Sequence, residues 1–348
     1  MKLLDTTIRD GSYALDFKWT YEDVEKIISR TERLGFEYIE IGHGLGLNAS
    51  SAEHGHSLLS DSEYMQVANK TLTKAKYGFF CIPNIARLED LNSVKDNGAS
   101  FVRIGVNVNT PELAIKYIQH AKKIGLEVMT NYMKSYAVSP KDFASSVIIA
   151  CDAGADVVYM VDSAGCMLPD EIEKYFIEYK KISNNIKLGF HGHNNLGMAV
   201  ANSIKCTQLG FDFIDCSLQG LGRSIGNAPT EQLVMALLQH GYNIDMDIPC
   251  LLEWGYDCIK DVSDRKVMHP LDLICGYTGF HSSYLKYIYK CSNEKKVDPL
   301  RLIIEYTKTN ILTMDYDELL KTADKLQIDT DDNPYSFRKF FSESFNDN

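Results

Sequence analysis

The sequence has no long hydrophobic run and no excess of positive charge. Nothing in it approaches the roughly 20 consecutive apolar residues that a membrane-spanning helix needs, so we expect no transmembrane segment. No signal peptide precedes the strand-like start Met1-Lys2-Leu3-Leu4-Asp5, which favours the cytoplasm. With 36 Lys and Arg against 47 Asp and Glu, the net charge is −11. This charge disfavours binding to nucleic acid or anionic membranes by bulk electrostatics.

The nine cysteines contain no Cys-x-x-Cys pair. They sit singly, many of them in apolar runs, as at Cys81, Cys151 and Cys216. An odd number with this spacing suits neither a disulfide framework nor a zinc knuckle. We therefore expect buried, reduced thiols.

A β/α unit repeats along most of the chain. Short β-leaning segments alternate with helical patterns; the expected strands are residues 3–8, 38–41, 77–82, 101–106, 127–132, 157–161, 187–190 and 213–217. Residues 9–13 are expected to form a loop after the first strand. Eight strands, each followed by a helix, over about 240 residues predict a (β/α)8 barrel.

A doubly wound sheet is the competing architecture, but it would place a phosphate-binding loop after its first strand. Gly220-Leu221-Gly222 lacks the third glycine and follows the last strand. We interpret it as a tight turn into the last barrel helix.

The pattern changes after Gly241, where helical segments follow one another without strands. They are expected at residues 248–262, 284–289, 299–307 and 316–326. We therefore predict a catalytic barrel over residues 1–245, a small helical domain over 246–328 and a polar tail over 329–348.

Two histidines mark the end of the seventh strand, in His191-Gly192-His193. Side chains alternate along a strand, so both imidazoles point the same way. They form half of a metal site; the alternative is a structural pair bonded to the backbone. Asp10 follows the first strand, near the seventh in a closed barrel, and completes a His2Asp site for a divalent ion that also binds substrate.

Arg9, next to Asp10, suits a developing oxyanion. Its alternative is a salt bridge with Glu40 inside the barrel, and both can hold at once. We expect Glu40 and Asp162 to be structural or to support the site indirectly. Ser163 either donates to a substrate carboxylate or caps the next helix.

Several segments together resemble the DRE-TIM metallolyases, and within them the 4-hydroxy-2-oxovalerate aldolase branch. The opening motif is Asp5-Thr6-Thr7-Ile8-Arg9-Asp10-Gly11. The other matching segments are residues 41–47, 159–165, 191–203, 226–229 and 276–283. The resemblance covers about residues 3 to 327, including the small helical domain.

The resemblance implies that Asp10, His191 and His193 bind Mn2+, with Mg2+ or Co2+ as alternatives. It implies that Arg9 stabilises the enolate of pyruvate and that Ser163 contacts the pyruvate carboxylate, with His191 also against the substrate. Asn227, in Gly226-Asn227-Ala228-Pro229, is a weaker candidate ligand. The substrates would be pyruvate and an aldehyde. Family aldolases partner an acylating aldehyde dehydrogenase, so such a partner is possible here, and we expect a homo-oligomer.

One departure concerns the base. Where the aldolases carry a His after Arg-Asp-Gly-x, this chain has Tyr13. Where they have Gly-x-Tyr-Ser-Ser, it has Gly279-Phe280-His281-Ser282-Ser283, as though the Tyr and the His had changed places. A free phenol titrates near ~10 and is a poor base at neutral pH, unlike an imidazole. We therefore assign His281 as the base and Tyr13 as its hydrogen-bonding partner; the alternative is that both only line the mouth.

Three functions follow, of which the first is preferred: a metal-dependent pyruvate aldolase acting on 4-hydroxy-2-oxoacids. The second is a Claisen-type synthase or lyase that uses an acyl-CoA, although the chain lacks an evident basic patch for the CoA phosphates. The third is a non-enzymatic binding or scaffold protein, which the full set of Arg9, Asp10, His191 and His193 disfavours. The sequence does not identify the aldehyde.

Overall fold

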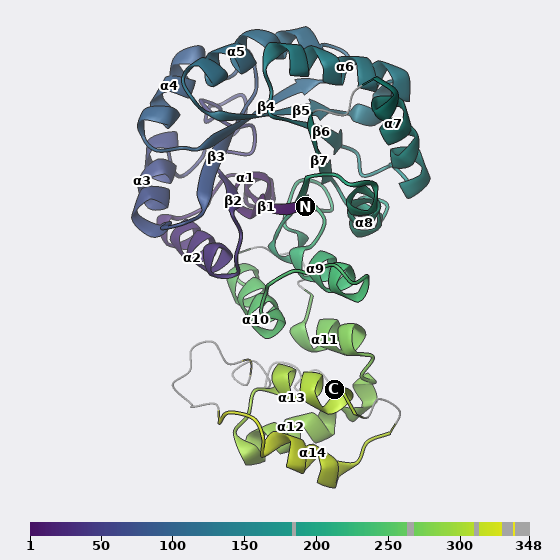
Figure 1. Ribbon diagram of the computed structural model, residues 1–348. Helices are drawn as coiled ribbons and strands as arrows, with labels where there is room; N and C mark the ends of the chain where they lie inside the picture. Colours follow the sequence, from purple (N-terminus) through teal and green to yellow (C-terminus); the bar gives the residue numbers. More distant parts are fainter. Residues whose placement is uncertain (183–185, 263–267, 310–312, 329–336, 338–348) are drawn as a thin grey trace. The chain divides into compact units, whose positions relative to one another are not determined.

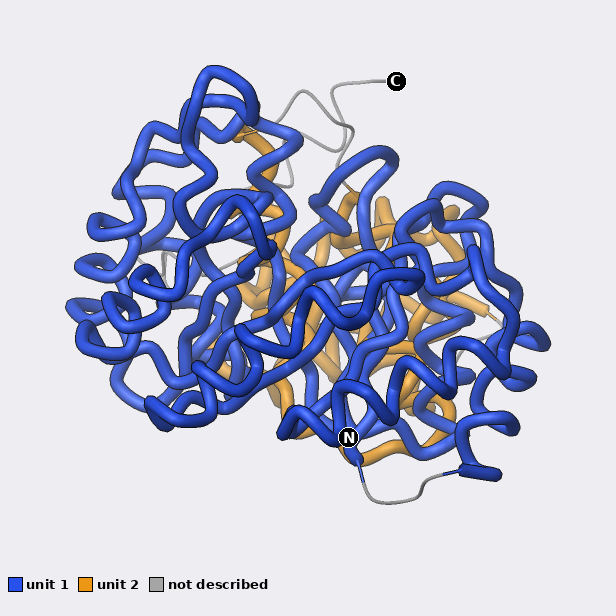
Figure 2. Tube along the Cα trace, turned by 90° about the horizontal axis from the view of Figure 1, so that it is seen from above, with its two compact units in different colours: residues 1–233 blue, residues 234–348 orange. Residues whose placement is uncertain are grey.

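The computed structural model describes residues 1–182, 186–262, 268–309, 313–328 and 337. The chain divides into two compact units, residues 1–233 and 234–348 (Figure 2). The predicted domain boundary near residue 245 stays a prediction. No helix of the described residues is both long and apolar enough to cross a membrane.

Eight parallel strands close the first unit into a barrel (Figure 1). They pair in chain order, and β8 pairs back onto β1, with Leu4 opposite Asp215. The strands are β1 (Lys2–Asp5), β2 (Tyr38–Ile41), β3 (Lys76–Cys81), β4 (Phe101–Asn107), β5 (Glu127–Met133), β6 (Val157–Asp162), β7 (Lys187–Gly192) and β8 (Phe213–Cys216). The predicted (β/α)8 barrel is confirmed.

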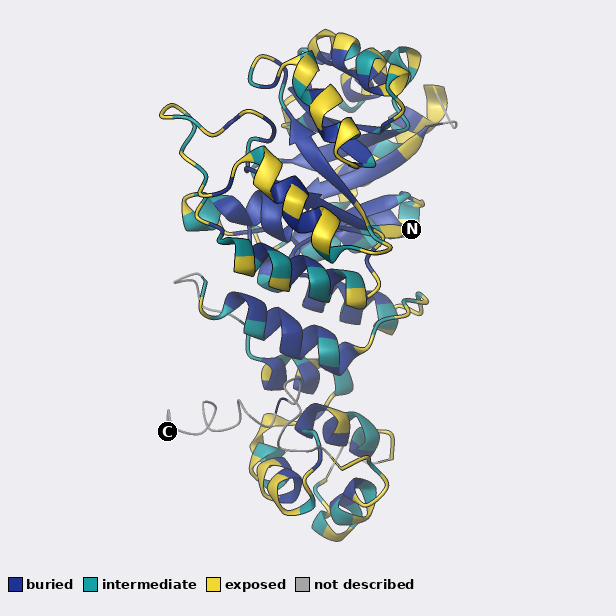
Figure 3. Cartoon of the chain, turned by 90° about the vertical axis from the view of Figure 1, so that its left-hand side faces the viewer, coloured by how far each residue is buried: buried dark blue, intermediate teal, exposed yellow. Residues whose placement is uncertain are grey.

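Helices surround the strands, with their exposed faces outward and the strands buried (Figure 3). The α-helices are α1 (Thr7–Gly11), α2 (Tyr21–Arg33), α3 (Asp61–Thr71), α4 (Leu88–Asp96), α5 (Ile115–Lys123), α6 (Pro140–Ala153), α7 (Pro169–Ile182), α8 (Ala199–Leu209) and α9 (Thr230–Gln239). Short 3-10 helices are η1 (Ser12–Leu15), η2 (Pro111–Ala114), η3 (Ser135–Ala137) and η4 (Leu218–Gly220).

Local sequence signals explain several helix starts. Thr20 and Asp23 form a capping box at α2: the Thr20 hydroxyl accepts from the Asp23 N–H at 3.1 Å, and the Asp23 carboxylate accepts from the Thr20 N–H at 3.2 Å. At α6, Ser139 caps the helix and Pro140 takes the first position, where its missing N–H costs nothing. Both helices therefore begin where the residues of their first turn favour a start.

An aromatic cluster packs inside the barrel. The Tyr38 ring on β2 lies 5.5 Å from that of Phe101 on β4 and 5.1 Å from that of Phe213 on β8. Strands that are not neighbours in the sheet can meet in this way only across the inside of the barrel. This packing fixes the strands whose ends carry the polar residues described below.

The start of the chain differs from the prediction. The first strand ends at Asp5, and residues 7–11 form the helix α1 instead of the end of a strand and a loop. The Asp5 carboxylate accepts hydrogen bonds from the N–H and the hydroxyl of Thr7, at 3.1 and 2.7 Å, and so turns the chain into a helix. Arg9 and Asp10 therefore project from a helical turn.

The described part of the second unit is helical. Its helices are α10 (Ile248–Ile259), α11 (Pro270–Thr278), α12 (Leu285–Lys295), α13 (Pro299–Thr307) and α14 (Tyr316–Ala323), with a 3-10 turn η5 (Ser282–Tyr284). The prediction missed α11, and also α3 in the barrel. The predicted polar tail lies outside the described residues, except for Phe337, which is buried.

Candidate active site

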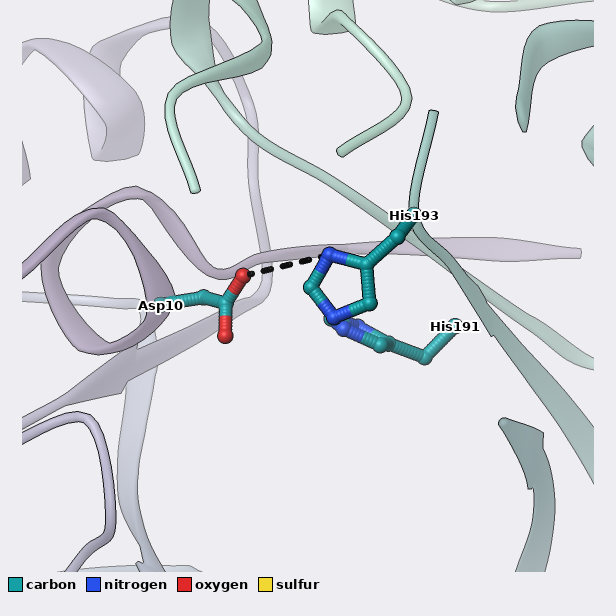
Figure 4. Close-up of side chains that lie close together, drawn as sticks. All are labelled: Asp10, His191 and His193. Atoms are coloured by element: carbon teal, nitrogen blue, oxygen red, sulfur yellow. Dashed lines mark ion pairs between the residues drawn. The ribbon is translucent and has the colours of Figure 1, made fainter. Parts of the chain in front are cut away.

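Three buried side chains meet at one end of the barrel. Asp10 comes from α1, His191 from β7 and His193 from directly after β7 (Figure 4). One carboxylate oxygen and one imidazole nitrogen from each histidine all lie within 4.8 Å of one another. The structure thus brings together the three residues that the sequence singles out as metal ligands.

Their surroundings fit a divalent cation. His193 Nδ1 lies 4.0 Å from Asp10 Oδ2 and has no hydrogen-bond partner among the described residues, although it is buried. The side-chain oxygen of Asn227 is buried and without a partner as well, while its amide donates to the Leu221 carbonyl at 3.3 Å. Buried polar atoms without partners are costly. A cation held by Asp10, His191 and His193 would give this imidazole nitrogen a partner, and the Asn227 oxygen is a further candidate ligand.

His191 is oriented by a residue that the sequence analysis missed. The Asp215 carboxylate, on β8, accepts a hydrogen bond from His191 Nδ1 at 2.8 Å. Burial alone would raise the pKa of Asp215, but the Arg103 guanidinium and the His191 hydrogen bond lower it. Asp215 is therefore ionised and holds the proton of His191 on Nδ1, which leaves Nε2 with its lone pair for a ligand.

A chain of alternating charges crosses the barrel interior. Arg9 donates from Nη1 to Asp10 at 2.6 Å and from Nε to Glu40 at 2.7 Å. Arg103 donates to the same Glu40 oxygen at 2.8 Å and pairs with Asp215. The expected Arg9–Glu40 salt bridge is present. Through Glu40 and Arg103, this salt bridge links Asp10 to Asp215, the partner of His191.

This arrangement favours the protonation states of metal ligands. Burial alone would raise the pKa of Asp10, but the Arg9 guanidinium, followed by His193 and His191, moves it well below its usual range. Burial lowers the pKa of His193 against the opposing charge of Asp10. Asp10 is thus ionised and His193 neutral at pH 7, which are the states that bind a cation.

A cavity of about 290 Å³ opens beside these residues in the first unit. Asn131, Ser163 and Tyr13 line it together with Arg9, Asp10 and the two histidines. Further polar lining comes from Lys134, Tyr136, Arg223 and Ser224. Ser163 does not cap α7; its hydroxyl oxygen accepts the Lys134 N–H at 2.9 Å. The Asp162 carboxylate instead accepts the N–H groups of Cys166 and Met167, at 3.0 and 2.9 Å, ahead of α7.

Tyr13 closes one side of the cavity. Its ring packs so tightly on Gly44 that a Cβ there would come within 2.6 Å of it. The Arg223 guanidinium lies 5.0 Å from the ring centroid. Burial, assisted by Asp10 and opposed by Arg9 and Arg223, raises the pKa of Tyr13 to about 12. Tyr13 is therefore a hydrogen-bond donor, not a base, at neutral pH.

His281 belongs to the second unit, where it is exposed at the start of η5. Its Nδ1 accepts the Ser283 N–H at 3.2 Å and lies 2.8 Å from the Ser283 hydroxyl. These contacts fix the ring and leave Nε2 for another group. The assignment of His281 as the base stays a prediction.

The chain matches the HMGL-like family model over residues 1–255. It is 34% identical to a 4-hydroxy-2-oxovalerate aldolase from Geobacillus genomosp. 3, over 94% of this chain and 97% of the relative. It is 33% identical to an oxaloacetate decarboxylase from Mycobacterium tuberculosis, over 88% of this chain and 91% of the relative. Its fold is similar to that of an HMG-CoA lyase from Brucella melitensis, with a TM-score of 0.65 and 19% identity, over 76% of this chain and 99% of that one.

Proposed function

Because the chain belongs to the HMGL-like family and is a carbon–carbon lyase, we propose that it is a divalent-metal-dependent aldolase. It would cleave or form 4-hydroxy-2-oxoacids from pyruvate and an aldehyde. The observation that carries this proposal is the buried cluster of Asp10, His191 and His193, set beside Arg9 at a cavity large enough for a small oxoacid.

Asp10, His191 and His193 would hold the cation, with the Asn227 oxygen as a further candidate. Two imidazoles and one carboxylate suit Mn2+, and Mg2+ or Co2+ are alternatives. When bound, the cation acts as a Lewis acid that polarises the carbonyl of a pyruvate unit. Asp215 is a positioning residue, because it fixes the orientation and tautomer of His191.

Arg9 would stabilise the negative charge that develops on the enolate oxygen. Its contacts with Asp10 and Glu40 use Nη1 and Nε, so Nη2 can donate to substrate. Both carboxylates hold the guanidinium in place before the reaction, and such preorganised donors lower the barrier most effectively. The Ser163 hydroxyl, whose oxygen already accepts the Lys134 N–H, would donate its proton to the pyruvate carboxylate.

Proton transfer at the C4 hydroxyl needs a base with a free lone pair. His281 is the proposed base, and Tyr13, whose pKa is raised to about 12 by burial, would donate a hydrogen bond to the same oxygen or to the base. In the cleavage direction, the base accepts the hydroxyl proton and the C3–C4 bond breaks. The products would be the aldehyde and the enolate of pyruvate.

The decisive experiment follows the methyl protons of pyruvate in D2O by NMR, with Mn2+ and no aldehyde. We expect exchange with the native enzyme and none with Asp10→Asn. Exchange at the native rate in Asp10→Asn would refute the site. A Claisen-type synthase would instead release free thiol from an acyl-CoA, and a lyase of that type would form a shorter acyl-CoA. A scaffold would bind no Mn2+ in elemental analysis. An acylating aldehyde dehydrogenase partner, a homo-oligomeric state and a cytoplasmic location stay predictions.

A further inference from the structure

Two positively charged side chains line the cavity but have no role in the proposed enolate chemistry. Lys134 follows β5, and Arg223 lies between η4 and α9. Both are exposed, yet both line the same cavity as Asp10 and Ser163. Neither residue lies on α1 or β7, the elements that carry or directly precede the three proposed metal ligands.

The backbone of both residues is held in a defined position. Lys134 has a φ of 58°, in the left-handed region that residues with a side chain seldom adopt. Its N–H donates to Ser163, and the next residue, Ser135, accepts the Val161 N–H at 3.0 Å. The turn that carries Lys134 is therefore attached to β6, next to the proposed carboxylate site.

Arg223 is placed in a similar way. Its N–H donates to Asp10 Oδ2 at 3.2 Å, and its guanidinium lies on the Tyr13 ring. The following residue, Ser224, also lines the cavity and also has a left-handed φ, of 59°. Arg223 is thus connected to the proposed metal ligand through its backbone, while its side chain extends along the cavity wall.

The charges of these two side chains are not compensated within the cavity. Arg9 is balanced by Glu40 and Asp10. Within the part of the chain that the structure describes, no carboxylate forms an ion pair with Lys134 or Arg223. Asp10 is the one acidic residue in the cavity lining, against Arg9, Lys134 and Arg223. A bound divalent cation would add to this positive excess.

We propose that Lys134 and Arg223 form an anion-recognising wall of the aldehyde pocket, so that the aldehyde partner of pyruvate carries a carboxylate or phosphate group. This inference rests on the proposed aldolase function. An anion there would gain charge-assisted hydrogen bonds, which are stronger than those between neutral groups. A small neutral aldehyde would offer the two cationic side chains no charge to pair with.

The test compares matched aldehydes in condensation with pyruvate and Mn2+, read by mass spectrometry. Butanal is paired with 4-oxobutanoate, and glyceraldehyde with glyceraldehyde 3-phosphate. We expect kcat/KM for at least one charged aldehyde to exceed that of its neutral partner by about tenfold or more, since tenfold corresponds to roughly 1.4 kcal/mol. Which pair shows the larger ratio distinguishes a carboxylate from a phosphate.

Lys134→Gln and Arg223→Gln should each reduce this charged-to-neutral ratio by about tenfold, and Arg223→Lys should restore part of it. Lys141→Gln is the matched control, because Lys141 is exposed on α6 outside the cavity lining, and it should keep the native ratio. A native ratio near one would overturn the inference. So would variants that reduce charged and neutral aldehydes equally, since the cations would then bind pyruvate itself.

Failure of the inference is distinguishable from failure of the function. Exchange of the pyruvate methyl protons needs no aldehyde. If the pyruvate methyl protons exchange but charged and neutral aldehydes react equally well, the anion-recognising wall is refuted and the aldolase function stands. If neither exchange nor condensation occurs, the aldolase function fails and the inference fails with it.

Discussion

The Asp215 carboxylate accepts a hydrogen bond from His191 Nδ1 at 2.8 Å, although the two residues lie 24 positions apart in the sequence. The pair ties the proposed metal ligand of β7 to the neighbouring strand β8. Arg103 pairs with the same carboxylate and reaches Glu40, which binds Arg9. The orientation of His191 therefore depends on the whole buried charge network, and not on β7 alone.

This relationship predicts the effect of Asp215→Asn. The amide oxygen can still accept from Nδ1, but it carries no negative charge to strengthen that hydrogen bond or to balance Arg103. We expect Mn2+ affinity to fall about 10- to 100-fold, measured by isothermal titration calorimetry. Asp152→Asn, an exposed aspartate on α6, is the control. Native affinity in a folded Asp215→Asn protein would show that Asp215 does not position His191.

Arg9→Lys should impair enolisation more than folding. A lysine ammonium keeps the charge but cannot bridge Glu40 and Asp10 while donating to a third oxygen. We expect exchange of the pyruvate methyl protons to slow by about 10²- to 10³-fold, the usual cost of losing one oxyanion donor. Arg87→Lys, at an exposed ion pair with Asp90, should exchange at the native rate. Equal exchange rates in both variants would show that Arg9 does not take part in enolisation.

Tyr13→Phe tests the role of the phenol through pH. Because burial raises the pKa of Tyr13 to about 12, the hydroxyl stays protonated from pH 6 to 10 and can only donate. We expect kcat/KM of the variant to be roughly tenfold lower, which is about the contribution of one hydrogen bond. The decrease should be the same at every pH. If the variant instead abolished an alkaline rise present in the native profile, Tyr13 would be the base.

His281→Asn tests the base itself. An amide preserves the size and polarity of the side chain but cannot accept a proton. We expect cleavage of 4-hydroxy-2-oxovalerate to slow by about 10²- to 10⁴-fold, the usual contribution of a general base, measured as pyruvate release. His240→Asn, also exposed in the second unit, serves as the control. Cleavage at the native rate would refute the assignment of His281.

The barrel could be predicted because eight short strands and their helices repeat at regular spacing. The pattern could not show where a single side chain determines the local conformation. One example is Asp5, whose hydrogen bonds to Thr7 start the helix α1 at residues 7–11. A signal for α3 was present: Ser60 and Glu63 form a capping box, with the Ser60 hydroxyl accepting the Glu63 N–H at 3.3 Å. The helix it starts lies well beyond β2, so the spacing of the β/α repeat alone does not predict it.

Some residues of the site could be predicted from the sequence and others could not. His191, His193 and Asp10 stand out because polar residues follow apolar strands at the end where barrel enzymes do their chemistry. Asp215 does not stand out, because it lies within the strand Phe213–Cys216, and strands buried on both faces show no clean alternation. Lys134 is exposed and reads as an ordinary surface lysine. Only the closed barrel brings it to the cavity.

Glu231 provides a last prediction, on stability. It is buried on α9, and its carboxylate accepts the Gln219 N–H at 2.9 Å, where Gln219 has a left-handed φ of 56°. Burial raises its pKa from 4.5 to about 7, against the opposing hydrogen bonds, with a smaller contribution from Asp5. Between those two values the folded state binds more protons than the unfolded state. The free energy of unfolding therefore falls as pH rises through this range and levels off above it.

Glu231→Gln keeps an oxygen for the Gln219 N–H and removes the titration. We expect the variant to gain on the order of 2 kcal/mol relative to the native protein between pH 5 and pH 8, since each pKa unit corresponds to about 1.4 kcal/mol. Thermal unfolding followed by circular dichroism at both pH values measures this difference. Glu112→Gln, at an exposed site, should not alter the pH dependence. Parallel pH dependence in native protein and Glu231→Gln would mean that Glu231 is ionised in the folded state even at pH 5, and that the Gln219 hydrogen bonds outweigh its burial.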